Sequence, residues 1–171
     1  MYRVGLSLFL TLFLFSCAST IDRKVKLNKF MDPDTGVETI ESIISFYHNE
    51  EQDLISFNQT KNPNNISWYI IGKFCLTLKK DFNTLELTTD AKSSILKVGG
   101  SYNSYDIKTE NSKLFRKVDY YKLNETMLRD LSMSGYIKLK FQNDTESEEF
   151  VLDQEQLDAV KEWITQITIP K

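Results

Sequence analysis

Few side chains in this sequence are equipped for acid–base or nucleophilic chemistry. His48 is the only histidine, and it lies in the polar stretch 47–51, which is typical of a strand end or a loop. A histidine within hydrogen-bond reach of a serine or of Cys75 would pair a nucleophile with its base. The chain contains neither a Gly-x-Ser-x-Gly elbow nor a His-Glu-x-x-His zinc motif. We therefore interpret His48 as a solvated surface residue and expect no catalytic residue.

Two acidic segments have the residue types that attract divalent cations. Residues 32–36 (Asp-Pro-Asp-Thr-Gly) faintly resemble a calcium loop, but the glycine is one position early for an EF-hand and no third ligand follows at the required spacing. Pro, Asp and Gly together are typical of a tight turn, which is the interpretation we favour. Residues 144–149 contain four carboxylates and are interpreted as a solvated hairpin tip. We expect neither a metal nor a cofactor.

Tyrosines form the other group with binding chemistry. Aromatic residues make up 12% of the chain, and eight of them are tyrosines. Tyr102 and Tyr105 follow a Gly-Gly pair, and Tyr120 and Tyr121 are adjacent in sequence. Because tyrosine combines an apolar ring with a polar hydroxyl, these four residues could line a binding face. Packing inside a sheet explains them at least as well, so both interpretations stay open.

The start of the chain carries the strongest pattern. The uncharged apolar run 4–15 follows a single Arg3, and it is too short for a membrane span, which needs about 20 residues. Such a run is typical of the hydrophobic region of an export signal. The run ends with Leu14 and Phe15, and Ser16 and Cys17 follow it directly. An aliphatic residue three positions before a cysteine, with a small residue directly before it, resembles the bacterial lipobox.

The lipobox resemblance implies processing and lipidation at Cys17. Leu14 and Ser16 match the motif as processing determinants, whereas Phe15 stands where small residues are usual, as in the relaxed lipoboxes of spirochaetes. In this family signal peptidase II cuts before the cysteine, the thiol receives diacylglycerol, and the new amino terminus is acylated. Each buried methylene contributes about 0.8 kcal/mol, so two or three acyl chains anchor a domain firmly. Alternatives are ordinary signal peptidase cleavage, which gives a freely secreted protein, and an uncleaved anchor.

Composition and charge restrict the classes of protein. The chain has 171 residues, of which 41% are hydrophobic and 26% charged, as expected for one globular domain. Its net charge of -3 argues against nucleic-acid binding, which needs a basic surface. Two cysteines exclude a disulfide-rich scaffold. With Cys17 lipidated, Cys75 has no intramolecular partner and is expected to be a buried free thiol.

Apolar side chains alternate with polar ones along most of the chain, which predicts about eight short strands. Segment 37–47 fits either a helical stripe or a strand, and we favour a strand because of its β-branched residues and the turn before it. Segment 66–78 is the most apolar strand, with a bulge expected at Gly72. The Gly99-Gly100 pair is expected to separate two strands.

Two helices complete the expected fold. Asn124 is expected to cap a short helix, and Asp153 with Gln156 resembles a capping box at the start of a C-terminal amphipathic helix. Parallel strands need helical crossovers, which are missing here, so the sheet is expected to be antiparallel. The predicted class is α+β, mainly antiparallel β: a curved sheet or partly closed barrel with the C-terminal helix packed on it. The predicted organisation is a signal peptide at 1–16, a short tether at 17–23, and one globular β-rich domain at 24–171.

These inferences predict a lipid-anchored protein of the bacterial cell envelope, with outer-membrane delivery indicated by Ala18 after the cysteine. Its role is expected to be binding or structural, without catalysis. The membrane is a partner through lipid on Cys17. Another envelope protein, a glycan or a host molecule could be the ligand, and nucleic acid is not expected. The alternative is a secreted or periplasmic hydrolase with an active site near His48.

Overall fold

The computed structural model describes residues 25–48, 51–75, 82–109 and 112–167. These residues form nine strands and two helices. In chain order they are β1 (Val25–Met31), β2 (Glu38–His48), β3 (Glu51–Asn62), β4 (Asn65–Cys75), β5 (Thr84–Thr89), β6 (Ser93–Thr109), β7 (Ser112–Leu123), α2 (Glu125–Met133), β8 (Ile137–Gln142), β9 (Ser147–Val151) and α3 (Gln154–Gln166).

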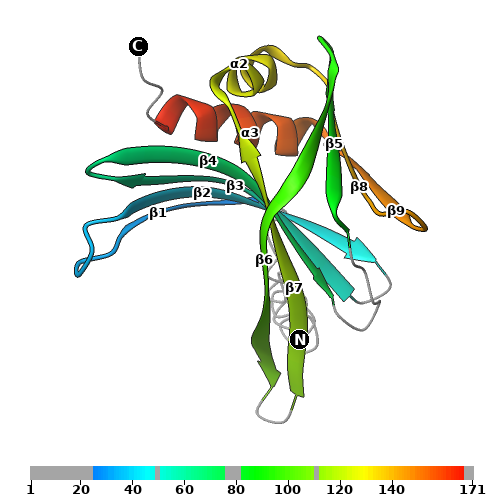
Figure 1. The fold of residues 1–171 in the computed structure, drawn as a ribbon, viewed down its shortest axis with the longest axis horizontal. Coiled ribbons are helices and arrows are strands. Elements are labelled where there is room, and N and C mark those ends of the chain that lie inside the picture. The colour runs from blue at the N-terminus through cyan, green and yellow to red at the C-terminus, as the bar shows by residue number, and fades with distance from the viewer. Residues whose placement is uncertain (1–24, 49–50, 76–81, 110–111, 168–171) are drawn as a thin grey trace, which may run out of the picture.

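All nine strands belong to one antiparallel sheet in the order β1-β2-β3-β4-β7-β6-β5-β8-β9. The sheet curls into a half-barrel, with β1–β4 on one side and β5, β8 and β9 on the other (Figure 1). Strands β6 and β7 lie between the two sides. The predicted class, a curved antiparallel sheet with the C-terminal helix packed on it, is confirmed.

One face of the sheet, which we call the inner face, carries the hydrophobic core and packs against α3. Trp163 of α3 is fully buried, and its indole N–H donates a hydrogen bond to the carbonyl oxygen of Ile40 on β2 at 3.0 Å. Helix α3 begins at the predicted capping box, in which Asp153 and Gln156 each bond the other's backbone N–H. Figure 1 shows α3 lying across β1–β4.

The ambiguous segment 37–47 forms a strand. β2 pairs with β1 on one side and with β3 on the other, and its Ile40 and Ile44 point to the inner face. The preceding turn favours this hairpin because Gly36 adopts a left-handed conformation with φ of 66°. A backbone in that region is strained for residues with a side chain, so glycine fixes where β1 ends and β2 begins.

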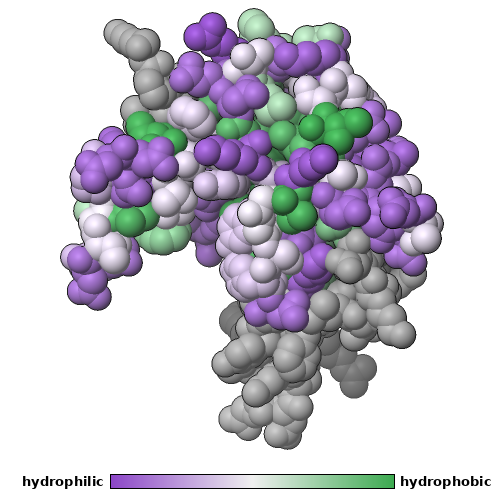
Figure 2. All heavy atoms as spheres, viewed as in Figure 1, coloured by the Kyte–Doolittle hydropathy of each residue, from purple (hydrophilic) through white to green (hydrophobic). Residues whose placement is uncertain are grey.

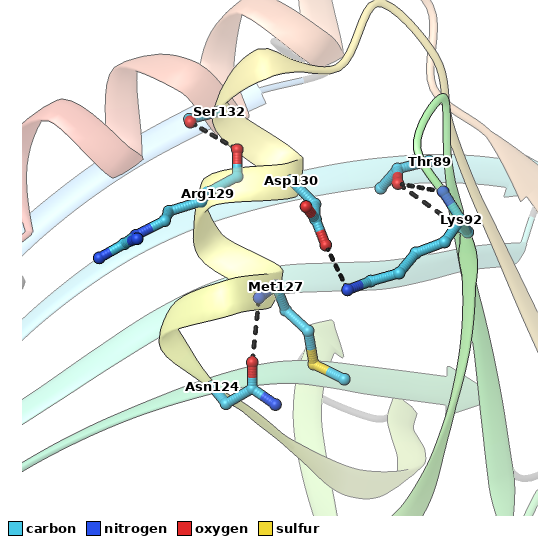
Figure 3. Close-up of polar contacts among 7 residues, drawn as sticks. All are labelled: Thr89, Lys92, Asn124, Met127, Arg129, Asp130 and Ser132. Atoms are coloured by element: carbon cyan, nitrogen blue, oxygen red, sulfur yellow. Dashed lines mark hydrogen bonds and ion pairs between the residues drawn. The ribbon is translucent and has the colours of Figure 1, made fainter.

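Helix α2 is held to the β5–β6 hairpin by polar contacts (Figure 3). The side chain of Asn124 accepts a hydrogen bond from the backbone N–H of Met127 at 3.0 Å, which confirms the predicted cap. Lys92, in the β5–β6 turn, forms an ion pair of 2.9 Å with Asp130 of α2. The carboxylate of Asp90 in the same turn accepts the N–H of Gly135 just beyond the helix. The contacts of Asp90 and Lys92 hold α2 against the side of the half-barrel formed by β5, β8 and β9.

The two glycine predictions inside strands are wrong. Gly99-Gly100 does not separate two strands, because β6 runs through it with a register shift between Val98 and Gly100 against β7. The irregularity lies where β6 stops pairing with β5 and starts pairing with β7, so it lets one strand serve both sides of the half-barrel. Gly72 carries no bulge, since its pairing with β3 and β7 is continuous. Glycine is there because the ring of Phe74 lies over it, 2.5 Å from where a Cβ would be.

Candidate functional site

The face of the sheet opposite α3, which we call the outer face, carries the most distinctive surface. Residues directly opposite one another in an antiparallel sheet point to the same face. The register therefore places Tyr120 of β7 beside Ile71 of β4 and Gly100 of β6, all on the outer face. By the same pairing, Tyr69 lies beside Asn58 of β3. Aromatic and neutral polar side chains from strands far apart in the sequence meet here.

These residues line a hollow of about 530 Å³ that we call the tyrosine groove. It spans six adjacent strands of the sheet, β1, β2, β3, β4, β7 and β6. Figure 2 shows the surface hollowed between the β1–β4 side and β6–β7. Its size lies within the range of about 300–1,000 Å³ that is typical of small-molecule sites. The lining residues are Phe30, Thr39, Asn58, Thr60, Tyr69, Ile71, Gly99, Gly100, Tyr120 and Lys122.

Tyr120 is the centre of a cluster of three tyrosine rings. Its ring stacks on that of Tyr102 with centroids 5.8 Å apart and meets the edge of the Tyr69 ring at 6.0 Å. Burial raises the pKa of the Tyr120 hydroxyl well above its usual value, and a hydrogen bond with Tyr102 and the nearby charge of Glu41 add to the rise. The hydroxyl therefore stays neutral at any physiological pH and acts as a hydrogen-bonding group.

The buried polar side chains of the groove are uncharged. Thr39 and Asn58 are each only 8% exposed. The side-chain carbonyl oxygen of Asn58 accepts a hydrogen bond from the hydroxyl of Thr60 at 3.2 Å. Among the described residues the amide N–H₂ of Asn58 donates no hydrogen bond, so it remains available to a bound molecule.

An ion pair borders the tyrosine cluster on the outer face. Glu41 of β2 and Lys73 of β4 approach to 3.7 Å across β3. Ser56 lies between them on β3 and is almost fully buried. The pair joins two strands that are not neighbours and gives Glu41, whose charge acts on Tyr120, a cationic partner.

Three of the four tyrosines singled out from the sequence have described side chains, and they divide between the two faces. Tyr102 and Tyr120 come together on the outer face, whereas Tyr121 is fully buried in the core. Tyr105 lies in β6, but its side chain is outside the described part of the structure. Sequence analysis missed Tyr69 and Asn58. The alternation of Tyr69 and Ile71 with the inward Trp68 and Ile70 is the signal that would have placed Tyr69 on the outer face.

The other predicted residues lie at the margin of the described structure or beyond it. His48 is the last residue of β2, where its backbone pairs with Glu51, and Cys75 is the last residue of β4, opposite Arg116. The side chains of both are outside the described residues, as are Leu14, Ser16 and Cys17 with the whole of 1–24. The predictions made on these residues stay predictions.

The acidic segment 32–36 forms the predicted turn, whereas the segment 144–149 is only in part the predicted hairpin tip. The carboxylate of Asp32 accepts hydrogen bonds from the backbone N–H groups of Asp34 and Thr35, and the bonds it accepts lower its pKa. Asp144 and Glu146 lie in the turn between β8 and β9, whereas Glu148 and Glu149 belong to β9, where Glu149 lies 3.6 Å from Lys138 of β8. Within the described residues no three potential ligand side chains are grouped as a metal site needs.

Neither described helix is long and apolar enough to cross a lipid bilayer. No protein-family model matches this chain, and no curated protein and no solved structure was found to be similar to it.

Proposed function

We propose that the chain is a lipid-anchored protein of the bacterial envelope that acts as a non-catalytic binding module, with its ligand in the tyrosine groove. The observation that carries the proposal is the groove itself: rings and uncharged hydrogen-bonding groups gathered on the sheet face that the two described helices, α2 and α3, leave uncovered. Sites for small molecules combine an apolar lining with a few polar groups that fix orientation, and this groove has both.

The exposure of the aromatic rings supports binding over packing. Tyr102 is 49% exposed and Phe30 is 54% exposed, although the inner face of the same sheet buries other aromatic side chains completely. Large exposed rings cost solvation free energy in the unbound protein, and ligand burial recovers it. The neutral Tyr120 hydroxyl and the Asn58 amide supply polar contacts beside those rings.

The lipobox at Leu14, Ser16 and Cys17 supports the membrane anchor. Residues 18–24 separate Cys17 from the first described strand, and a chain of that length reaches at most about 30 Å when fully extended. An acylated Cys17 would therefore keep the start of β1 within that distance of the bilayer surface. A ligand at or near the envelope fits this placement.

The anchor is tested by the intact mass of the wild-type protein and of Cys17→Ala from membrane and supernatant fractions. We expect a membrane-bound chain that begins at Cys17 and is heavier by its acyl chains, and an unprocessed chain in the variant. An unmodified chain that begins at Ser19 and is free in the supernatant would overturn the anchor.

The binding role is tested with the membrane-extracted protein in detergent, screened against a library of small molecules by thermal shift. Tyr120→Ala removes the central ring of the groove, and Tyr136→Ala is the matched control because Tyr136 is an exposed tyrosine outside the groove. We expect ligands that raise the Tm of the wild type and of Tyr136→Ala but not of Tyr120→Ala. The binding role would be overturned if no molecule of the library raised the Tm, or if the ligands raised the Tm of Tyr120→Ala as much as that of the wild type.

A further inference from the structure

We infer that the ligand of the tyrosine groove is an uncharged oligosaccharide. This inference rests on the proposed function and adds the chemical class of the ligand. A sugar ring has faces of C–H groups and a rim of hydroxyls, so its site needs flat apolar surfaces next to groups that both donate and accept hydrogen bonds. The groove supplies the two kinds of surface side by side.

The aromatic rings form the apolar part. Tyr69 and Tyr120 both line the hollow, with ring centroids 6.0 Å apart and ring planes at 87° to each other. Phe30 lines the same hollow from β1, and more than half of its surface is exposed. Aromatic rings carry partial negative charge on their faces, which favours the weakly positive C–H groups of a sugar over another electron-rich surface.

The polar part matches hydroxyl groups. Thr39 presents a hydroxyl that can both donate and accept, and the Thr60 hydroxyl, which donates its hydrogen to Asn58, can still accept. The amide of Asn58 offers two further N–H donors beside them. A site built from such groups binds a ligand with matching hydroxyls and rejects one without them. The reason is that the polar groups would lose their hydrogen bonds to water and gain none to the ligand.

The charges argue against ionic ligands. Lys122 is the one charged side chain among the described residues that line the groove, and it is exposed. Glu41, the carboxylate near Tyr120, is already paired with Lys73 at 3.7 Å. A single exposed lysine contributes little to binding an anion in salt solution. Neither a cation nor a multiply charged anion finds a partner buried in this site.

The shape favours a chain of sugars over a single ring. The lining residues come from six adjacent strands, so the hollow is long across the sheet. One wall is the glycine pair of β6. A Cβ added at Gly100 would have no atom within 4 Å, so the missing side chain leaves open space in the hollow.

The inference is tested by binding of the detergent-extracted protein to immobilised short oligomers of glucose, mannose, galactose and N-acetylglucosamine, with sialylated and sulfated glycans beside them. We expect binding to a neutral oligomer. Gly100→Leu, which places a side chain in the hollow, and Tyr120→Ala should each weaken it at least about tenfold. Tyr136→Ala should bind as the wild type does.

A second variant separates recognition of hydroxyls from simple apolar binding. Thr39→Val removes one hydroxyl with little change of shape, and that hydroxyl makes no hydrogen bond within the described residues. We expect it to weaken the sugar several-fold while the Tm of the unbound protein is kept. Unchanged sugar binding by Thr39→Val would overturn the assigned hydrogen-bonding role.

The remaining outcomes separate the ligand class from the groove. Preference for acidic glycans, lost in Lys122→Ala, would overturn an uncharged ligand. If no glycan binds but a molecule of the thermal-shift library does, and Gly100→Leu blocks it, the oligosaccharide is wrong and the groove remains a binding site. If neither screen yields a ligand, both the inference and the proposed function fail.

Discussion

Tyr120 and Tyr121 are neighbours in β7, yet they belong to two different surfaces. Tyr121 is fully buried on the inner face, where its ring meets the edge of Phe141 at 5.5 Å. Tyr120 is half-buried on the outer face, between the rings of Tyr69 and Tyr102. One residue type therefore packs the core at one position and lines an open groove at the next. The strand register, and not aromatic content, decides which role a tyrosine has.

Two glycines inside strands repeat the contrast. At Gly72 on the inner face, the space of the missing side chain is filled by the ring of Phe74, and Phe141 lies 3.2 Å from the Cβ position. At Gly100 on the outer face, the same space is empty. At Gly72 the inner face has no space for a further methyl group, whereas at Gly100 the outer face has open space.

The largest difference is expected when each tyrosine is truncated. Tyr121→Ala should lower the free energy of unfolding by about 3 kcal/mol or more, because it leaves a cavity under Phe141. Tyr120→Ala should lower it by about 1 kcal/mol or less, because the ring is only half-buried. Urea unfolding of both variants and the wild type measures the two values. Equal losses would show that the outer face is packed as tightly as the core.

The next effect is expected at Gly72. Gly72→Ala should lower the free energy of unfolding by about 1–3 kcal/mol, because the new methyl overlaps the ring of Phe74. That ring has little room to move, since Phe82 and Phe141 lie 5.1 Å and 4.9 Å from its centroid. Phe74→Leu in the same chain should recover part of the loss. A neutral Gly72→Ala would mean that the ring shifts freely.

Most of the fold could be predicted because local alternation specifies it. β5 and β8 alternate between buried and half-buried residues along their whole length, and the sequence shows the same period. Caps at Asn124 and Asp153 fixed the starts of the two helices from residue chemistry alone. Glycines were the weak point, since Gly99-Gly100 is equally typical of a turn and of a bulge inside a long strand.

The groove could be predicted only in part. Tyr102 and Tyr120 were candidates because of their residue type, but their partners come from strands distant in sequence. Phe30 and Thr39 face one another across β1 and β2, and Tyr120 reaches the same hollow only because β7 pairs on one side with β4, which is distant in sequence, and on the other with its neighbour β6. Strand order is set by non-local packing, which periodicity does not contain.

The ionisation of Tyr120 is a smaller but direct probe of the outer cluster. Its pKa is raised above the ordinary value of 10.0 by burial, by the Tyr102 hydroxyl and by Glu41. The folded state thus holds this proton more tightly than the unfolded state does. The resulting stability is present in full below about pH 10 and is lost as the pH rises through the folded pKa.

Carbon-13 labelling of the tyrosine Cζ atoms measures this titration by NMR. Tyr120 should remain protonated at a pH at which an exposed tyrosine is ionised, and Tyr102→Phe should bring its pKa closer to the ordinary value. The resonance is assigned by its loss in Tyr120→Phe. Ionisation of Tyr120 near pH 10 would contradict the hydrogen-bonded cluster.

The smallest change in stability is expected at Gly100, and there it should be favourable. Gly100→Val replaces a glycine in a strand, which costs about 0.5–1 kcal/mol of conformational entropy, with a residue of high strand propensity. The new side chain meets no atom within 4 Å of its Cβ and shares the outer face with Tyr120. Urea unfolding should therefore show an unchanged or slightly raised free energy, while the hollow becomes smaller. A Gly100→Val variant that is stable and has a smaller groove would show that the outer face has free space. Gly72→Val is the contrasting substitution on the inner face, where the new side chain would overlap the ring of Phe74. Marked destabilisation by Gly100→Val would mean that the outer face tolerates no more volume than the core.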